Sequence, residues 1–144
     1  MRGERGFTLL EMLVVLLIAG LMSALSIAWL DTGKAPLQQA LERLASASRQ
    51  QAELARHGGE IRGLRWSGNR PEFVRWVNAR WQAEKVALGD WPQALQVDWA
   101  NSQEPRWVFT PSGVERSAVL NWHWPDGSER WQWSSDGQLR RSPL

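Results

Sequence analysis

The feature that most restricts the fold of this chain is one long uncharged run near its N-terminus. Residues 12–30 are 19 consecutive residues without a charged side chain, whereas the other segments mix polar and charged residues. As an α-helix this run measures about 28 Å, which is close to the hydrocarbon thickness of a bilayer. It is the only segment of membrane length, so we expect a single membrane-spanning helix.

Three interpretations of residues 1–30 compete. The first is a secretory signal peptide, with Arg2 and Arg5 as its charged region and Ser26-Ile27-Ala28 before its cleavage site. The second is an uncleaved membrane anchor. The third depends on the short string Gly6-Phe7-Thr8-Leu9-Leu10-Glu11, which opens the apolar run.

Glu11 is the residue that separates these interpretations. A carboxylate costs about 2.5–3.5 kcal/mol at the centre of a membrane helix and less near its end. Glu11 lies only about 6 Å along the axis from Phe7, so contact with lipid headgroups would by itself explain it. Cleavage between Gly6 and Phe7 offers another explanation, because it creates a free ammonium on the same apolar helix. The ammonium of one subunit and the carboxylate of a neighbour would then neutralise each other.

This string resembles the signature of type IV pilins and pseudopilins, in which a short basic leader ends in Gly and a Glu stands fifth after the cut. Gly6, Phe7, Thr8, Leu9 and Glu11 all match it. The resemblance implies cleavage after Gly6 by a prepilin peptidase and N-methylation of Phe7. We favour it over the conventional signal peptide.

A second helix is expected after a short irregular stretch at residues 31–36, where Gly33 and Pro36 disfavour a continuous helix. From Leu37 onward small and apolar residues recur at helical spacing, and Gly58-Gly59 ends the pattern. The expected buried stripe is Leu37, Leu41, Leu44, Ser48, Ala52 and Ala55. We therefore divide the chain into a leader (1–6), a membrane and filament-core helix (7–30), an amphipathic helix (31–59) and a head (60–144).

The head is predicted to be rich in β-strands, which makes the chain an α+β protein. Turn residues containing Gly, Pro, Asn and Asp separate the candidate strands. These strands are Ile61–Ser67, Glu72–Asn78, Ala94–Trp99, Arg106–Thr110, Ala118–Trp124, Glu129–Ser134 and Gln138–Arg141. Residues 79–92 are expected to form an irregular loop or a short strand.

The last two hairpins allow predictions of register. A tight turn at Asp126-Gly127 would place Trp122 opposite Trp131 and Leu120 opposite Trp133. The apolar face would contain Leu120, Trp122, Trp124, Trp131 and Trp133, with Asn121, His123 and Gln132 on the other face. A three-residue loop at Ser135-Asp136-Gly137 would place Leu139 opposite Trp133.

Arginine precedes tryptophan five times in this chain, which has eleven tryptophans and no tyrosine. Interleaved cations and aromatics also line grooves that bind single-stranded nucleic acid. Adjacent residues of a strand point to opposite faces, however, so Arg in water and Trp in the core explains the pairs more simply. Arg140 and Arg141 are the candidate nucleic-acid contacts under the alternative.

The sequence offers little support for catalysis. It has no cysteine and only two histidines, His57 and His123, and both are expected at the surface. Carboxylate pairs, serine motifs and phosphate loops at recognisable spacing are lacking. Charge is nearly balanced, with 17 basic and 15 acidic residues. We expect no enzymatic activity, no cofactor and no metal.

Beyond the leader, the chain resembles the H-type minor pseudopilin of the type II secretion system. The resemblance is carried by Arg43-Leu44-Ala45, by residues 59–64, by the strand and Pro-Ser-Gly turn at residues 106–113, and by the closing strand with Asp136-Gly137. It implies a long N-terminal helix with a head of two β-sheets. It further implies incorporation into the periplasmic pseudopilus, in a tip complex, which helps to export folded proteins.

The same resemblance implies the cellular setting and the partners. The chain would be a single-pass protein of the bacterial inner membrane, with its head in the periplasm. Its partners would be other minor and major pseudopilins, the prepilin peptidase, the inner-membrane secretion platform and, as a further candidate, the exported protein. The main alternative is a minor pilin of a type IV pilus that binds DNA during uptake.

Overall fold

The computed structural model describes residues 3–31 and 35–144, and within the first range it describes the side chains of residues 8–23. The chain forms two compact units, residues 1–36 and 37–144. The first contains helix α1 (Gly3–Asp31). Of the predicted irregular stretch at residues 31–36, residues 32–34 lie outside the described residues, whereas Asp31 belongs to α1 and residues 35 and 36 belong to α2.

Helix α2 (Ala35–Gly58) begins and ends as the sequence predicts. Pro36 lies in the first turn, where its missing N–H leaves no helical hydrogen bond unmade. Gly59, just after the helix, has φ of 66°, which is the left-handed conformation that commonly ends a helix. One face of α2 is buried, and it contains Leu37, Ala40, Leu41, Leu44, Ala45, Ala47, Ser48, Gln51 and Ala55.

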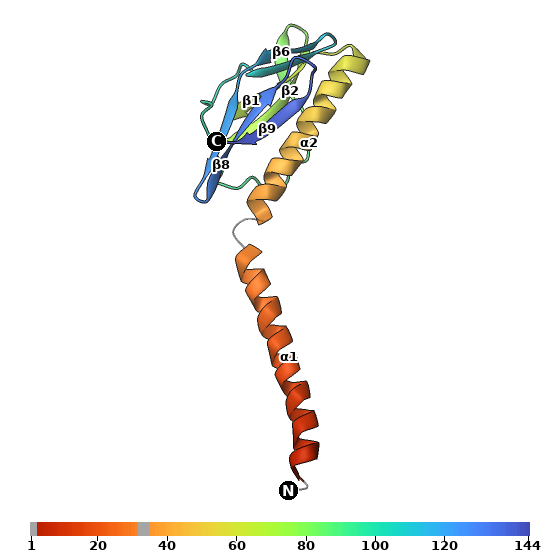
Figure 1. Ribbon diagram of the computed structural model, residues 1–144. Coiled ribbons are helices and arrows are strands. Elements are labelled where there is room, and N and C mark those ends of the chain that lie inside the picture. Colours follow the sequence, from red (N-terminus) through yellow and green to blue (C-terminus); the bar gives the residue numbers. More distant parts are fainter. Residues whose placement is uncertain (1–2, 32–34) are drawn as a thin grey trace. The chain divides into compact units, whose positions relative to one another are not determined.

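The rest of the second unit consists of two antiparallel sheets, and α2 runs alongside them (Figure 1). The five-stranded sheet has the order β3-β2-β1-β5-β6 and the four-stranded sheet the order β4-β7-β8-β9. The first contains β1 (Arg62–Ser67), β2 (Arg70–Val77), β3 (Arg80–Ala83), β5 (Trp107–Thr110) and β6 (Gly113–Ser117). The second contains β4 (Gln96–Val97), β7 (Leu120–Trp124), β8 (Gly127–Trp133) and β9 (Leu139–Pro143). The predicted α+β class with two antiparallel sheets is confirmed.

Two of these strands differ from the prediction. The sequence predicts only a turn at residues 111–113 and no strand after it, whereas β6 occupies Gly113–Ser117 at the edge of its sheet. Most residues of β6 are exposed, so no apolar alternation marks the strand in the sequence. The strand predicted at residues 94–99 shrinks to the two residues of β4.

Tryptophan side chains fill much of the space between the sheets and α2. Trp107, Trp122 and Trp131 are fully buried, and they share one apolar cluster with Leu41 and Leu44 of α2. Neighbouring rings meet mostly edge to face, as for Trp122 and Trp131 with centroids 5.4 Å apart. The tryptophan-rich composition therefore builds the core of the head.

The β7–β8 hairpin keeps the predicted apolar face but not the predicted register. Leu120 lies opposite Trp131, and Trp124 lies opposite Gly127. The two turn residues are Pro125 and Asp126, not Asp126 and Gly127. Proline at the second position and glycine at the fourth suit a type I turn, and a side chain at Gly127 would press on the Trp124 indole at 3.1 Å. Because the slip is two residues, every side chain stays on its predicted face.

The β8–β9 hairpin has the predicted register. Trp133 lies opposite Leu139, and Gly137 adopts φ of 80° at the end of a three-residue loop. The Ser134 backbone N–H donates to the Gln138 carbonyl at 2.9 Å. In the same turn the Ser134 hydroxyl donates to the Asp136 carboxylate, which lowers the pKa of that carboxyl.

The Arg-Trp pairs follow the predicted division between water and core only in part. Trp107 and Trp131 are buried, and the arginine before each is exposed, as expected. Arg65 departs from the prediction because only 8% of it is exposed. Its guanidinium donates to Glu72 on the neighbouring strand at 2.7 Å, which allows the charge to be buried. Trp76 departs in the opposite direction and is 43% exposed.

Candidate functional site: the apolar N-terminal helix

Helix α1 carries the residues that the sequence marks for processing and assembly. The backbones of Gly6 and Phe7 lie within its first turns, and Glu11 follows Phe7 by four residues. Four residues of helix span about 6 Å, so Glu11 lies one turn beyond the predicted cleavage point. The side chain of Phe7 lies outside the described residues.

Most described side chains of α1 are apolar, and all of them are exposed. The exposed fraction is 71% for Leu9 and 69% for Leu16. The large exposed apolar residues are Leu9, Leu10, Met12, Leu13, Val14, Val15, Leu16, Leu17, Ile18, Leu21 and Met22. A helix that is apolar on every side belongs in a membrane or among other helices. Glu11 is the only acidic residue among residues 8–23.

The structure leaves the membrane-spanning length of α1 untested. Within the part of the chain that the structure describes, no helix is both long and apolar enough to cross a membrane. The predicted span at residues 7–30 extends beyond the described side chains.

Comparison with protein families addresses this helix directly. Residues 1–27 match the family model described as the prokaryotic N-terminal methylation motif. The chain carries this methylation motif. The match supports the predicted resemblance to pilin-like and pseudopilin-like proteins, whereas the individual roles of Gly6, Phe7 and Glu11 stay predictions.

The other comparisons add one similar structure. The chain is similar to the minor pseudopilin EpsH from the type 2 secretion system of Vibrio cholerae, with 21% sequence identity and a TM-score of 0.49. The match covers 69% of this chain and 96% of that one. No curated protein matches the chain.

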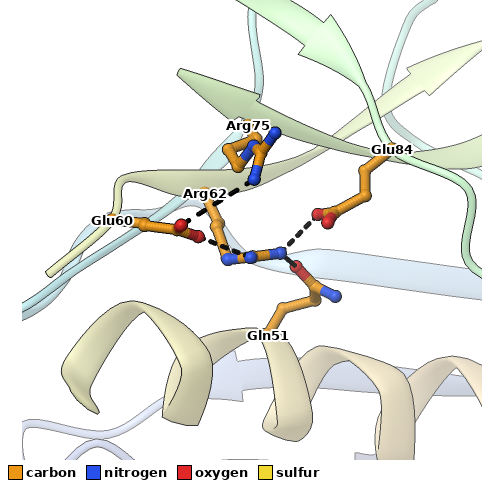
Figure 2. Close-up of polar contacts among 5 residues, drawn as sticks. All are labelled: Gln51, Glu60, Arg62, Arg75 and Glu84. Carbon is orange, nitrogen blue, oxygen red and sulfur yellow. Dashed lines mark hydrogen bonds and ion pairs between the residues drawn. The ribbon is translucent and has the colours of Figure 1, made fainter. Parts of the chain in front are cut away.

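Within the second unit, a buried polar cluster joins α2 to the five-stranded sheet (Figure 2). Arg62, at the start of β1, has a side chain that is only 7% exposed. Its guanidinium donates to Gln51 of α2 at 2.8 Å and to Glu60 at 2.5 Å, and it also pairs with Glu84. Arg75 lies 3.7 Å from Glu60 and completes the cluster. The buried charge is thus held by groups from α2, from the segment before β1 and from the segment after β3.

The sequence interpretation missed this cluster because it placed Ala52 in the buried stripe. In the structure Gln51 is 5% exposed and Ala52 is half-buried. The spacing Leu44, Ser48, Gln51, Ala55 is as regular as the predicted one, and it places a glutamine in the buried stripe. A glutamine at a stripe position indicates a buried polar partner, which Arg62 supplies.

The two candidate nucleic-acid contacts lie in different environments. Arg140 is exposed and lies 4.0 Å from Asp136. Arg141 pairs with Glu129 of β8 and Glu42 of α2, and its guanidinium lies 5.1 Å from the centre of the Trp131 ring. Burial alone would lower the pKa of Arg141, but the two carboxylates outweigh it and raise that pKa. Arg141 therefore has a structural role, and nucleic-acid contact by either residue stays a prediction.

Proposed function

We propose that this chain is a minor pseudopilin of a type II secretion system, which assembles through its N-terminal helix into the periplasmic pseudopilus. The supporting observation is the methylation motif on a helix whose described side chains are mostly apolar and are all exposed. Such an apolar surface is unfavourable in water, and packing against like helices in a filament would bury it.

Processing precedes assembly in this proposal. A prepilin peptidase cuts after Gly6 and Phe7 is methylated, so that residues 7–30 anchor the chain once through the inner membrane. The head, residues 60–144, then lies in the periplasm. The membrane platform of the secretion system and other pseudopilins are the partners that assembly requires.

Assembly draws on the charge of Glu11. Buried in lipid or in a filament core, a lone carboxylate carries a desolvation cost. The ammonium of Phe7 on an adjacent subunit offsets much of that cost and is itself neutralised. The pair also fixes the axial position of one helix against the next, because it forms in one register only.

Deletion of the gene in its own bacterium tests this function. We expect loss of the proteins exported by the type II pathway from the medium, and recovery when the full-length chain is restored. DNA uptake serves as the control, because the pilus alternative predicts the opposite pattern. Normal export together with impaired DNA uptake would contradict the secretion function.

A further inference from the structure

The β2–β3 hairpin carries a tryptophan pair that the core does not use. Trp76 of β2 lies opposite Trp81 of β3, and their rings meet edge to face with centroids 5.0 Å apart. Trp76 is 43% exposed and Trp81 is half-buried. Strand β3 is the outermost strand of its sheet. This hairpin therefore presents aromatic surface at an open sheet edge.

The hairpin geometry determines which backbone N–H and C=O groups of β3 point away from β2. The turn residues Asn78 and Ala79 have φ of 51° and 63°, as in the two-residue turn that pairs the flanking residues by hydrogen bonds. Alternation along the ladder then makes Trp76 and Trp81 a non-hydrogen-bonded pair. The backbone N–H and C=O of Trp81 and Ala83 consequently point away from β2, and within residues 35–144 no backbone hydrogen bond occupies them.

The unpaired charge at this edge is positive, because the nearby carboxylates already form ion pairs with buried arginines. Glu72 pairs with the buried Arg65, and Glu84 pairs with the buried Arg62. Arg80, which begins β3, and Lys85, two residues beyond its end, are exposed. Neither has an ion pair within the described part of the chain. Each end of the open strand therefore has a cation available for an acidic partner.

We propose that the open edge of β3 is a docking site for an acidic, extended segment of another protein. The segment adds to the sheet as a strand and bonds to the outward backbone groups of Trp81 and Ala83. Its acidic side chains meet Arg80 and Lys85, and its apolar side chains pack on the Trp76–Trp81 pair. Tryptophan and arginine are the residues that most often dominate protein interfaces. This site goes beyond the proposed assembly through α1 and uses none of that helix.

A hollow beside β3 extends this docking edge. It has a volume of about 440 Å³ and is lined by residues 70–73 of β2 and by residues 84–88, which follow β3. This lining includes Pro71, Phe73, Lys85, Val86 and Leu88. A side chain of the docked strand fits here, next to the free ammonium of Lys85.

A protein strand suits this edge better than single-stranded nucleic acid does. Nucleic-acid grooves offer successive aromatic faces on which bases stack. Trp76 and Trp81 meet edge to face at an interplanar angle of 65°, so the edge of one ring covers part of the face of the other. Nucleic acid would also leave the outward backbone groups of Trp81 and Ala83 unused.

Peptide binding to the full-length chain in detergent tests the site. The probe is a fluorescent peptide of about ten residues in which glutamate and valine alternate, because that pattern forms an acidic strand. The comparison probes are the matching lysine–valine peptide and an oligothymidine strand. We expect the glutamate peptide to bind about tenfold more tightly than either, with affinity that falls as salt rises. Equal binding of the two peptides, or preference for oligothymidine, would overturn the proposal.

Two variants locate the binding to this edge. Ala83→Pro removes an outward N–H and leaves the bonds to β2 intact, and Trp76→Ala removes the exposed ring without touching the core. We expect each to weaken binding of the glutamate peptide about tenfold. Arg80→Glu should do the same, whereas Arg49→Glu makes the same charge change on the exposed side of α2 and should not. Unchanged binding by Ala83→Pro and Trp76→Ala would show that the edge is not used.

Discussion

Under the proposed function, Glu11→Ala will leave the protein in the inner membrane but abolish its incorporation into the pseudopilus. Membrane insertion depends on the apolar residues around Glu11, and removing a charge makes insertion easier. Assembly loses the group that neutralises the neighbouring subunit's Phe7 ammonium, which then stays unpaired in an apolar surrounding. A loss of about 1.4 kcal/mol in the free energy of one subunit contact weakens that contact about tenfold. We therefore expect export of type II substrates to fall by about tenfold or more.

Disulfide cross-linking measures this assembly step. The chain has no cysteine, so Leu16→Cys, at an exposed position of α1, supplies a single reactive site. Cross-links to a major pseudopilin that carries a cysteine on its own helix should form with Glu11 present and disappear in Glu11→Ala. Leu13→Ala, which shortens a nearby exposed side chain without changing charge, is the matched control and should retain them. Normal export by Glu11→Ala would refute the charge-pairing argument.

Arg62→Ala will destabilise the head more than any exposed substitution. The change leaves Gln51, Glu60 and Glu84 without the cation that joins them. Removing one partner of a buried ion pair costs about 3–5 kcal/mol, and partial exposure of the two glutamates favours the lower end of this range. Because Gln51 belongs to α2, the loss also loosens the attachment of that helix to the sheet.

Urea unfolding of the full-length chain in detergent, followed by tryptophan fluorescence, measures this loss. Arg62→Lys retains the charge without the planar fork of donors, so it should have an intermediate free energy of unfolding. Arg130→Ala removes an exposed arginine whose Nε donates to the Asn121 side-chain oxygen at 3.3 Å. This variant should stay within about 0.5 kcal/mol of the unchanged protein in its free energy of unfolding. An Arg62→Ala protein as stable as Arg130→Ala would contradict the structural importance of the cluster.

What the sequence predicts well is local. The methylation motif, the helix ends at Pro36 and Gly59, and the faces of the Trp-rich strands all follow from short-range patterns. The register of β7 with β8 does not, because Pro125-Asp126 and Asp126-Gly127 both form acceptable turns. In the observed turn a side chain at residue 127 would meet the Trp124 ring at 3.1 Å, which favours glycine there.

The features that sequence reasoning missed depend on contacts between distant residues. Gln51 and Arg62 are 11 positions apart, and Arg62 and Glu84 are 22 apart, so neither pairing follows from a repeating pattern. Buried Arg65 likewise needs its cross-strand partner Glu72. The sequence interpretation also missed the Trp76–Trp81 pair, because it assumed that tryptophan side chains lie in the core.

Intact-mass analysis of the protein extracted from native membranes tests the central claim most directly. We expect a mature chain that begins at Phe7 and carries one additional methyl group on its α-amino nitrogen. In a strain without prepilin peptidase the same protein should begin at Met1. A native protein that begins at Trp29, or that keeps Met1 when the peptidase is active, would contradict this account.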